Sequence, residues 1–173
     1  MEFTVIQGDI ARQRADVLVN AAGTSLRMGS GVAGALRRTA GEELNEEAMA
    51  KGPVDLGEVA VTDAYDLDAE YVVHAAAMPH YGDGRATAES IREAARNALD
   101  AADGRGAESV VVPALGCGVA GFDLREGARI ICEEIADFDP ESLEDAGFVA
   151  YADDEYETVR AVADEVRALG DSA

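Results

Sequence analysis

The chain has 173 residues, a length that fits one domain with a full hydrophobic core, so we expect a single domain over residues 1–173. It carries 35 acidic and 14 basic residues, and its net charge of -21 makes a surface that repels nucleic acid and anionic membranes. No segment approaches the ~20 apolar residues of a membrane span, and no basic and apolar leader opens the chain, so we expect a cytoplasmic protein.

Short apolar runs alternate with segments of helical period, which predicts an α/β protein with helices packed on a sheet. Strands are predicted at residues 3–7, 17–20, 58–63, 71–75, 108–112 and 147–151. Helices are predicted at residues 31–51, with a break at Gly41 left open, and at 87–103, 123–138 and 153–169. Asp123 and Glu126 resemble a capping box at the start of the third helix.

The basic residues include one lysine, Lys51. This acidic, lysine-poor composition resembles that of halophile proteins, in which dense carboxylates stay hydrated and salt screens their repulsion.

Cysteine and histidine are scarce, with two residues of each, and they lack the spacing of metal ligands. We therefore expect no disulfide, no metal site and no cofactor. Cys132 falls on the apolar stripe of a helix and is expected in the core. Cys117 falls in a glycine-rich loop, where a small residue tolerated at a turn is favoured over a thiol nucleophile.

Two glycine-rich loops carry the clearest functional signal. The run from Glu108 to Asp123 has a β-branched strand, then Gly116, Gly118 and Gly121, and then a helix. A second loop of this kind spans residues 28–34. Closely spaced glycines let backbone amides approach an anion, and a following helix adds its free N–H groups. The pattern favours a phosphate ligand, although one such loop alone is compatible with a tight connection.

Four strand ends deliver such groups toward one rim of the sheet, where ligands of α/β proteins bind. Five stretches lie along the chain in this order: QGDI (7–10), VNAAG (19–23), GSGVAGAL (29–36), YVVHAA (71–76) and PALGCGVAGF (113–122). Together they resemble the macro domains, a family that binds ADP-ribose, and the acidic composition resembles a haloarchaeal-type stand-alone member. The resemblance implies a three-layer α/β/α fold with a mixed, mostly parallel six-stranded sheet. It also implies that the partner is ADP-ribose or an ADP-ribosylated substrate. We expect a monomer, and the net negative charge predicts no nucleic-acid or membrane partner.

The resemblance assigns a role to each matching residue. Asp9 would accept from the adenine amino group and the Ile10 amide would donate to the ring, although Asp9 could instead cap a turn. Tyr151 would pack on the adenine face, or be an ordinary residue at a strand end. Asn20 would face the ribose or tie down its own loop. The implied ligand contacts are Asp9, Ile10, Asn20, Ala22, Gly29, Ser30, Gly31, Val32, Ala33, Leu115, Gly116, Cys117, Gly118, Val119, Ala120, Gly121, Phe122 and Tyr151.

Three positions depart from the family pattern. The second asparagine of hydrolytic members is Gly23 here, their first-loop aspartate falls at Ala33, and an aromatic residue of the second loop falls at Ala120. The catalytic residues stay unassigned, with Asp123 and Asp83 as candidate bases.

The sequence thus predicts a protein that binds ADP-ribose and hydrolyses ADP-ribosyl esters, on mono-ADP-ribosylated protein or O-acetyl-ADP-ribose. The alternative is a binding module without turnover. A dinucleotide oxidoreductase is disfavoured because its glycine fingerprint should follow the first strand, which leads to Gly8, Asp9 and Ile10 instead.

Overall fold

The structure is a computed structural model, and it describes residues 1–80, 84–118 and 121–171. Six strands within these ranges form one sheet: β1 (Glu2–Gln7), β2 (Val17–Gly23), β3 (Val59–Asp63), β4 (Tyr71–Met78), β5 (Ser109–Val112) and β6 (Asp145–Ala150). Their order across the sheet is β1-β6-β5-β2-β4-β3. Neighbouring strands are parallel except β3 and β4, which are antiparallel. The predicted mixed, mostly parallel sheet of six strands is confirmed.

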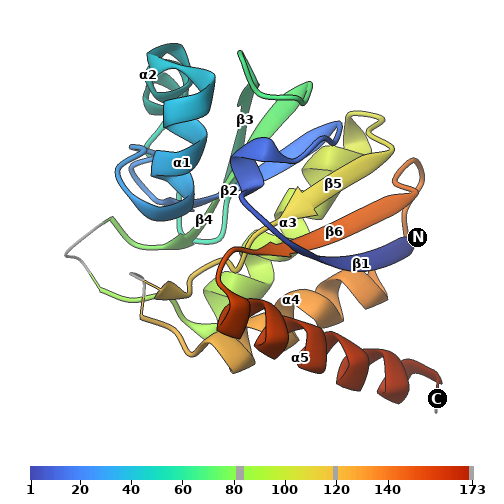
Figure 1. Ribbon diagram of the computed structural model, residues 1–173. Coiled ribbons are helices and arrows are strands. Elements are labelled where there is room, and N and C mark those ends of the chain that lie inside the picture. The colour runs from blue at the N-terminus through green and yellow to red at the C-terminus, as the bar shows by residue number, and fades with distance from the viewer. Residues whose placement is uncertain (81–83, 119–120, 172–173) are drawn as a thin grey trace.

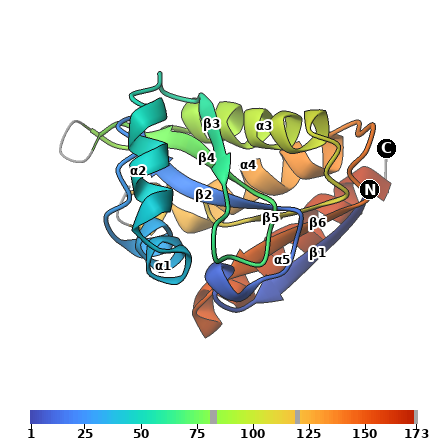
Figure 2. The same cartoon turned by 90° about the horizontal axis from the view of Figure 1, so that it is seen from above.

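Among the described residues, five α-helices cover the two faces of this sheet, and Figure 1 shows their arrangement. They are α1 (Gly31–Ala40), α2 (Glu42–Lys51), α3 (Ala88–Gly104), α4 (Leu124–Asp137) and α5 (Asp153–Asp171). The helices α1 and α2 lie on one face, and α3, α4 and α5 on the other (Figure 2). The fold therefore has the three layers that were predicted.

Alternation along the central strands assigns side chains to the two faces. In β2, Val17 and Val19 point into the larger apolar core, which α3, α4 and α5 cover. Leu18 points to the other face and packs with Leu36 of α1. Because β2 and β4 are covered on both sides, they read as nearly continuous apolar runs, as is typical of parallel strands.

The structure differs from the predicted elements mainly at their ends. The predicted helix over 31–51 is two helices, because Gly41 has a φ of 99° and interrupts the helical path. A 3₁₀ turn, η1 (Ile10–Arg12), follows β1 and was not predicted. At α4 the Asp123 side chain accepts from the Glu126 N–H at 3.0 Å. Both halves of a capping box are present instead at α3, between Thr87 and Ser90.

Candidate functional site

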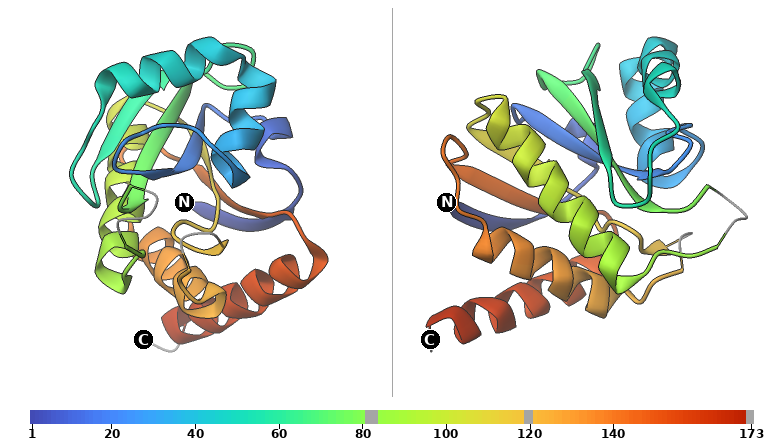
Figure 3. Two further views of the ribbon diagram at one scale, coloured as in Figure 1. Left: turned by 90° about the vertical axis from the view of Figure 1, so that its left-hand side faces the viewer. Right: turned by 180° about the vertical axis from the view of Figure 1, so that it is seen from behind.

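A cavity of about 780 Å³ opens where β1, β2, β5 and β6 end. The left view of Figure 3 looks onto this end of the sheet, with α1 above and α5 below. The predicted ligand contacts that line the cavity are Asp9, Ile10, Ala22, Ser30, Gly31, Val32, Gly116, Cys117, Gly118 and Tyr151. Residues from four separate strand ends are thus brought together.

The remaining predicted contacts are either outside the described residues or not part of the cavity lining. Val119 and Ala120 are outside the described residues. Ala33 and Leu115 are buried and pack in the two apolar cores under the loops. Four further predicted contacts do not line the cavity: Asn20, Gly29, Gly121 and Phe122.

The start of α1 presents uncapped backbone donors to the cavity. Ser30 is the N-cap residue, with extended backbone angles and no side-chain hydrogen bond to the helix. The first intrahelical bond runs from the Gly34 N–H to the Ser30 carbonyl at 3.3 Å, so the preceding amides of the first turn have no helical acceptor. Gly31 has a φ of 63°, a conformation that favours glycine. Such a helix start accepts an anion through its N–H groups and positive dipole end.

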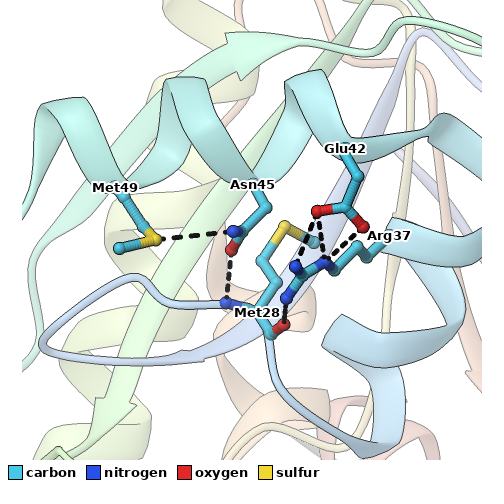
Figure 4. Close-up of polar contacts among 5 residues, drawn as sticks. All are labelled: Met28, Arg37, Glu42, Asn45 and Met49. Carbon is cyan, nitrogen blue, oxygen red and sulfur yellow. Dashed lines mark hydrogen bonds and ion pairs between the residues drawn. The ribbon is translucent and has the colours of Figure 1, made fainter.

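The backbone that leads into this turn is held on both sides at Met28, as Figure 4 shows. The Met28 N–H donates to the Asn45 Oδ1 of α2 at 2.9 Å, and Arg37 Nη1 donates to the Met28 carbonyl at 2.7 Å. Arg37 is held in turn by a bidentate pair with Glu42. Met28 is fully buried and Asn45 is nearly so. The position of the α1 loop is therefore set from outside the cavity.

The second loop is shaped by two glycines with different surroundings. Gly116 has a φ of 74°, and a Cβ there would lie 2.7 Å from the Ile91 Cγ1 of α3. Gly118 has a φ of 73°, and no atom of the described residues lies within 4 Å of such a Cβ. The first glycine lets the loop pack on the helix below, while the second leaves backbone bare at the cavity.

Cys117 lies between these glycines. Burial is the largest cause that raises the pKa of its thiol to about 11, and the charges of Asp123 and Glu155 add to the effect. Its S–H donates to the Leu115 carbonyl at 3.5 Å. Since the thiolate is the nucleophilic form, this environment favours the interpretation of Cys117 as a loop residue. Cys132 is fully buried in the larger core, as predicted.

The β1 and β6 ends supply the polar rim of the cavity. Asp9 Oδ1 accepts from the Ala11 N–H at 2.9 Å and caps η1, so the turn-capping role is present. Its other carboxylate oxygen has no hydrogen bond among the described residues. Tyr151 follows the last residue of β6 and is 75% exposed at the cavity edge.

Sequence reasoning missed three charged side chains that line the cavity: Arg38 of α1, and Asp154 and Glu155 of α5. Val32, Ala35 and Arg38 follow each other at the i, i+3 spacing of one helix face, which could have indicated the arginine. Asp154 and Glu155 lie in the first turn of α5, shortly after Tyr151. The predicted strand over 147–151 ends at the rim, so the start of the helix that follows it could have indicated them.

The candidate bases receive no support from this geometry. Asp123 caps α4 and does not line the cavity, and Asp83 is outside the described residues. Gly23 pairs with Met78 at an irregularity of the β2–β4 ladder, where a Cβ would lie 3.2 Å from the Pro79 carbonyl oxygen.

Asn20 belongs to a buried polar chain that crosses three strands beneath the cavity. Its Nδ2 lies 3.0 Å from His74 Nδ1, and His74 Nε2 lies 2.9 Å from Thr62 Oγ1. Thr62 donates its hydroxyl proton to the Asp63 carbonyl, so it accepts from His74 Nε2–H, and His74 Nδ1 accepts from Asn20. The Asn20 Oδ1 has no partner among the described residues. Asn20 thus acts in the core and does not reach the cavity wall.

Within the described ranges, no three His, Cys, Asp or Glu side chains are grouped closely enough to hold a metal ion. The helices described there are also too short or too polar to cross a membrane.

Comparison with known proteins places these features in a family. The sequence matches the family model of the Macro domain over residues 19–131. An uncharacterized protein of Sulfolobus acidocaldarius is 38% identical over 169 residues, covering 95% of this chain and 91% of that protein. An uncharacterized protein of Mycobacterium tuberculosis is 39% identical over 153 residues, or 88% of this chain and 42% of that protein. The chain thus spans less than half the length of the mycobacterial relative.

Solved structures agree with this match. The macrodomain of Trypanosoma brucei in complex with ADP-ribose has a TM-score of 0.83 and 29% identity, covering 92% of this chain and 68% of that one. A variant of the Oceanobacillus iheyensis macrodomain, solved with ADPR, has a TM-score of 0.83 at 24% identity. It covers 98% of this chain and 93% of that one, and it shows the likeness of fold alone.

Proposed function

The chain belongs to the macro domain family, and we propose that it binds ADP-ribose in the cavity between α1 and α5. The observation that carries the proposal is the pair of backbone surfaces on this cavity. The uncapped first turn of α1 and the bare backbone at Gly118 both face it, and both suit a diphosphate. Two relatives in fold, from T. brucei and O. iheyensis, were solved with this ligand.

Asp9 and Ile10 support an adenine at the η1 end of the cavity. One carboxylate oxygen of Asp9 accepts a hydrogen bond within the turn, and the other can accept one from a ligand donor. An adenine amino group is such a donor, whereas the carbonyl of hypoxanthine at the same ring position is an acceptor. The site should therefore prefer ADP-ribose to its inosine counterpart.

Asp9→Asn tests this assignment without removing the turn cap, because the amide oxygen still accepts from Ala11. The amide NH₂ then faces the adenine amino group, donor against donor. We expect the affinity for ADP-ribose, measured by calorimetric titration, to fall about tenfold and the affinity for inosine diphosphate ribose to rise. Loss of both affinities to the same extent would contradict the adenine assignment, and no binding of ADP-ribose by the wild type would end the proposal.

Hydrolysis of ADP-ribosyl esters is the second candidate function. The cavity offers amides near Gly118 for developing negative charge, and its lining also includes the carboxylates of Asp154 and Glu155. Binding without turnover is favoured by Gly23 and Ala33. Neither has a polar side chain, whereas the hydrolytic members have an asparagine and an aspartate at these positions. Incubation with mono-ADP-ribosylated protein and with O-acetyl-ADP-ribose separates the two, since a binding module releases no product from either.

We further propose a monomeric, cytoplasmic protein adapted to high salt, with no nucleic-acid or membrane partner. The net charge of -21 supports this proposal. A melting temperature that rises from about 0.1 M to about 2 M KCl is expected, because salt shortens the range of carboxylate repulsion. A melting temperature independent of KCl would contradict the adaptation to salt, and sedimentation of a dimer would contradict the monomer.

A further inference from the structure

Two consecutive arginines on α1 send their side chains to different places. Arg37 is committed to the fold: it donates to the Met28 carbonyl and makes a bidentate pair with Glu42 (Figure 4). Arg38 lines the cavity. Within the described part of the chain, the Arg38 guanidinium has no carboxylate within 4.0 Å and makes no hydrogen bond. The chain has 35 acidic residues, and yet none of the described ones pairs with this guanidinium, which can therefore bind an anionic ligand.

The Arg38 side chain runs back toward Gly34, which lies one helical turn earlier. A Cβ built on Gly34 would lie 3.2 Å from Arg38 Nη1 and 3.1 Å from the Gly29 carbonyl oxygen. The guanidinium therefore folds back along α1 toward its uncapped first turn, as long helical side chains tend to do. The missing Cβ at Gly34 leaves room for this position. Full positive charge is thus added close to amides that carry only partial charge.

The other charged groups on the cavity make this cation consequential. Asp9, Asp154 and Glu155 also line it, so among the described residues the cavity lining includes three carboxylates and one guanidinium. A diphosphate that enters meets carboxylates of its own sign, and without Arg38 the backbone donors alone would have to offset them. A guanidinium can both neutralise charge and donate two parallel hydrogen bonds to a phosphate.

We propose that Arg38 is a ligand-binding residue that selects nucleotides carrying a diphosphate over the bare nucleoside. This inference rests on the proposed binding of ADP-ribose and adds to it the side chain that reads the ligand's charge. Because Arg38 takes no part in the Met28 contacts, its role in binding is separable from the stability of the loop.

The test compares Arg38→Gln, Arg38→Lys and the wild type by calorimetric titration with ADP-ribose, ADP and adenosine. Arg160→Gln, which removes one charge from an exposed position on α5 away from the cavity, is the matched control. We expect Arg38→Gln to weaken ADP-ribose and ADP about tenfold at about 0.1 M KCl, and adenosine less than about twofold. The loss should shrink at about 2 M KCl, and Arg38→Lys should restore part of the affinity.

The melting temperatures of the variants show whether a loss of affinity comes from a loss of stability. We expect them to be unchanged, because Arg38 makes no contact that the fold requires. Unchanged ADP affinity in Arg38→Gln would overturn the proposal, and so would an equal loss for ADP and adenosine. A wild type that binds none of the three ligands would instead remove the proposed function on which this inference rests.

Discussion

Acid should destabilise this protein through His74, a buried histidine of β4, the strand that lies between β2 and β3. Its ring is fully buried, and burial lowers its pKa from 6.5 to about 4, while Glu47 and Lys51 of α2 act in opposite directions. A proton on Nδ1 would also face the amide NH₂ of Asn20, which is a donor. The folded protein therefore holds His74 neutral at pH values where the unfolded chain would protonate it.

The sign and size of the effect follow from this difference. Between pH 6.5 and about 4 the unfolded state binds more protons at His74 than the folded state, so stability falls as the pH falls through this window. One pKa unit corresponds to about 1.4 kcal/mol, and moving from about pH 7.5 to about pH 4.5 should cost about 2–3 kcal/mol through this residue.

His74→Gln isolates this contribution, because glutamine keeps one acceptor for Asn20 and one donor for Thr62 but does not titrate. Urea unfolding of both proteins at the two pH values, in the same high concentration of KCl, gives four free energies of unfolding. The carboxylates are common to both proteins and cancel in the comparison. The wild type should lose about 2–3 kcal/mol more than the variant on acidification, and equal losses in the two proteins would refute the reasoning.

Three further predictions concern the loops. Asn45→Ala leaves the buried Met28 N–H without its acceptor and should lower the free energy of unfolding by about 1–3 kcal/mol, whereas Asn45→Asp, which keeps an oxygen there, should lose less in urea unfolding. Cys117, with a pKa of about 11, should react with iodoacetamide at about pH 8 far more slowly in the folded than in the unfolded protein; fast labelling of the folded form would contradict its buried setting. Gly116→Ala should lower the melting temperature more than Gly118→Ala, because both have positive φ but a Cβ is obstructed only at Gly116; equal losses would show that backbone strain alone decides.

The sequence predicted the six strands and the layer architecture because both follow from local apolar patterns. Strand ends were less predictable: β2 runs to Gly23 and β4 to Met78, three residues beyond their expected ends. Ala21, Ala22 and their partners on β4 are small and weakly patterned, so only pairing across the sheet reveals them as strand residues.

The candidate site was predictable where the backbone acts and less so where side chains from distant segments meet. Glycines after strands indicated both loops directly. By contrast, the contact of Asn20 with His74 joins residues 54 positions apart, and nothing local to either indicates it. Arg38 escaped notice because an arginine on a helix is ordinarily a solvated residue, and its isolation from carboxylates is a property of the folded surface.

The proposed diphosphate site and the two positions that depart from the hydrolytic family members, Gly23 and Ala33, are separate features of this fold. The two amide surfaces are fixed by contacts outside the ligand space, by Asn45 and Arg37 at Met28 and by Ile91 under Gly116. None of these contacts depends on what stands at Gly23 or Ala33. A chain that lacks polar side chains at those two positions can therefore keep both amide surfaces, and these are what the proposed binding of ADP-ribose requires.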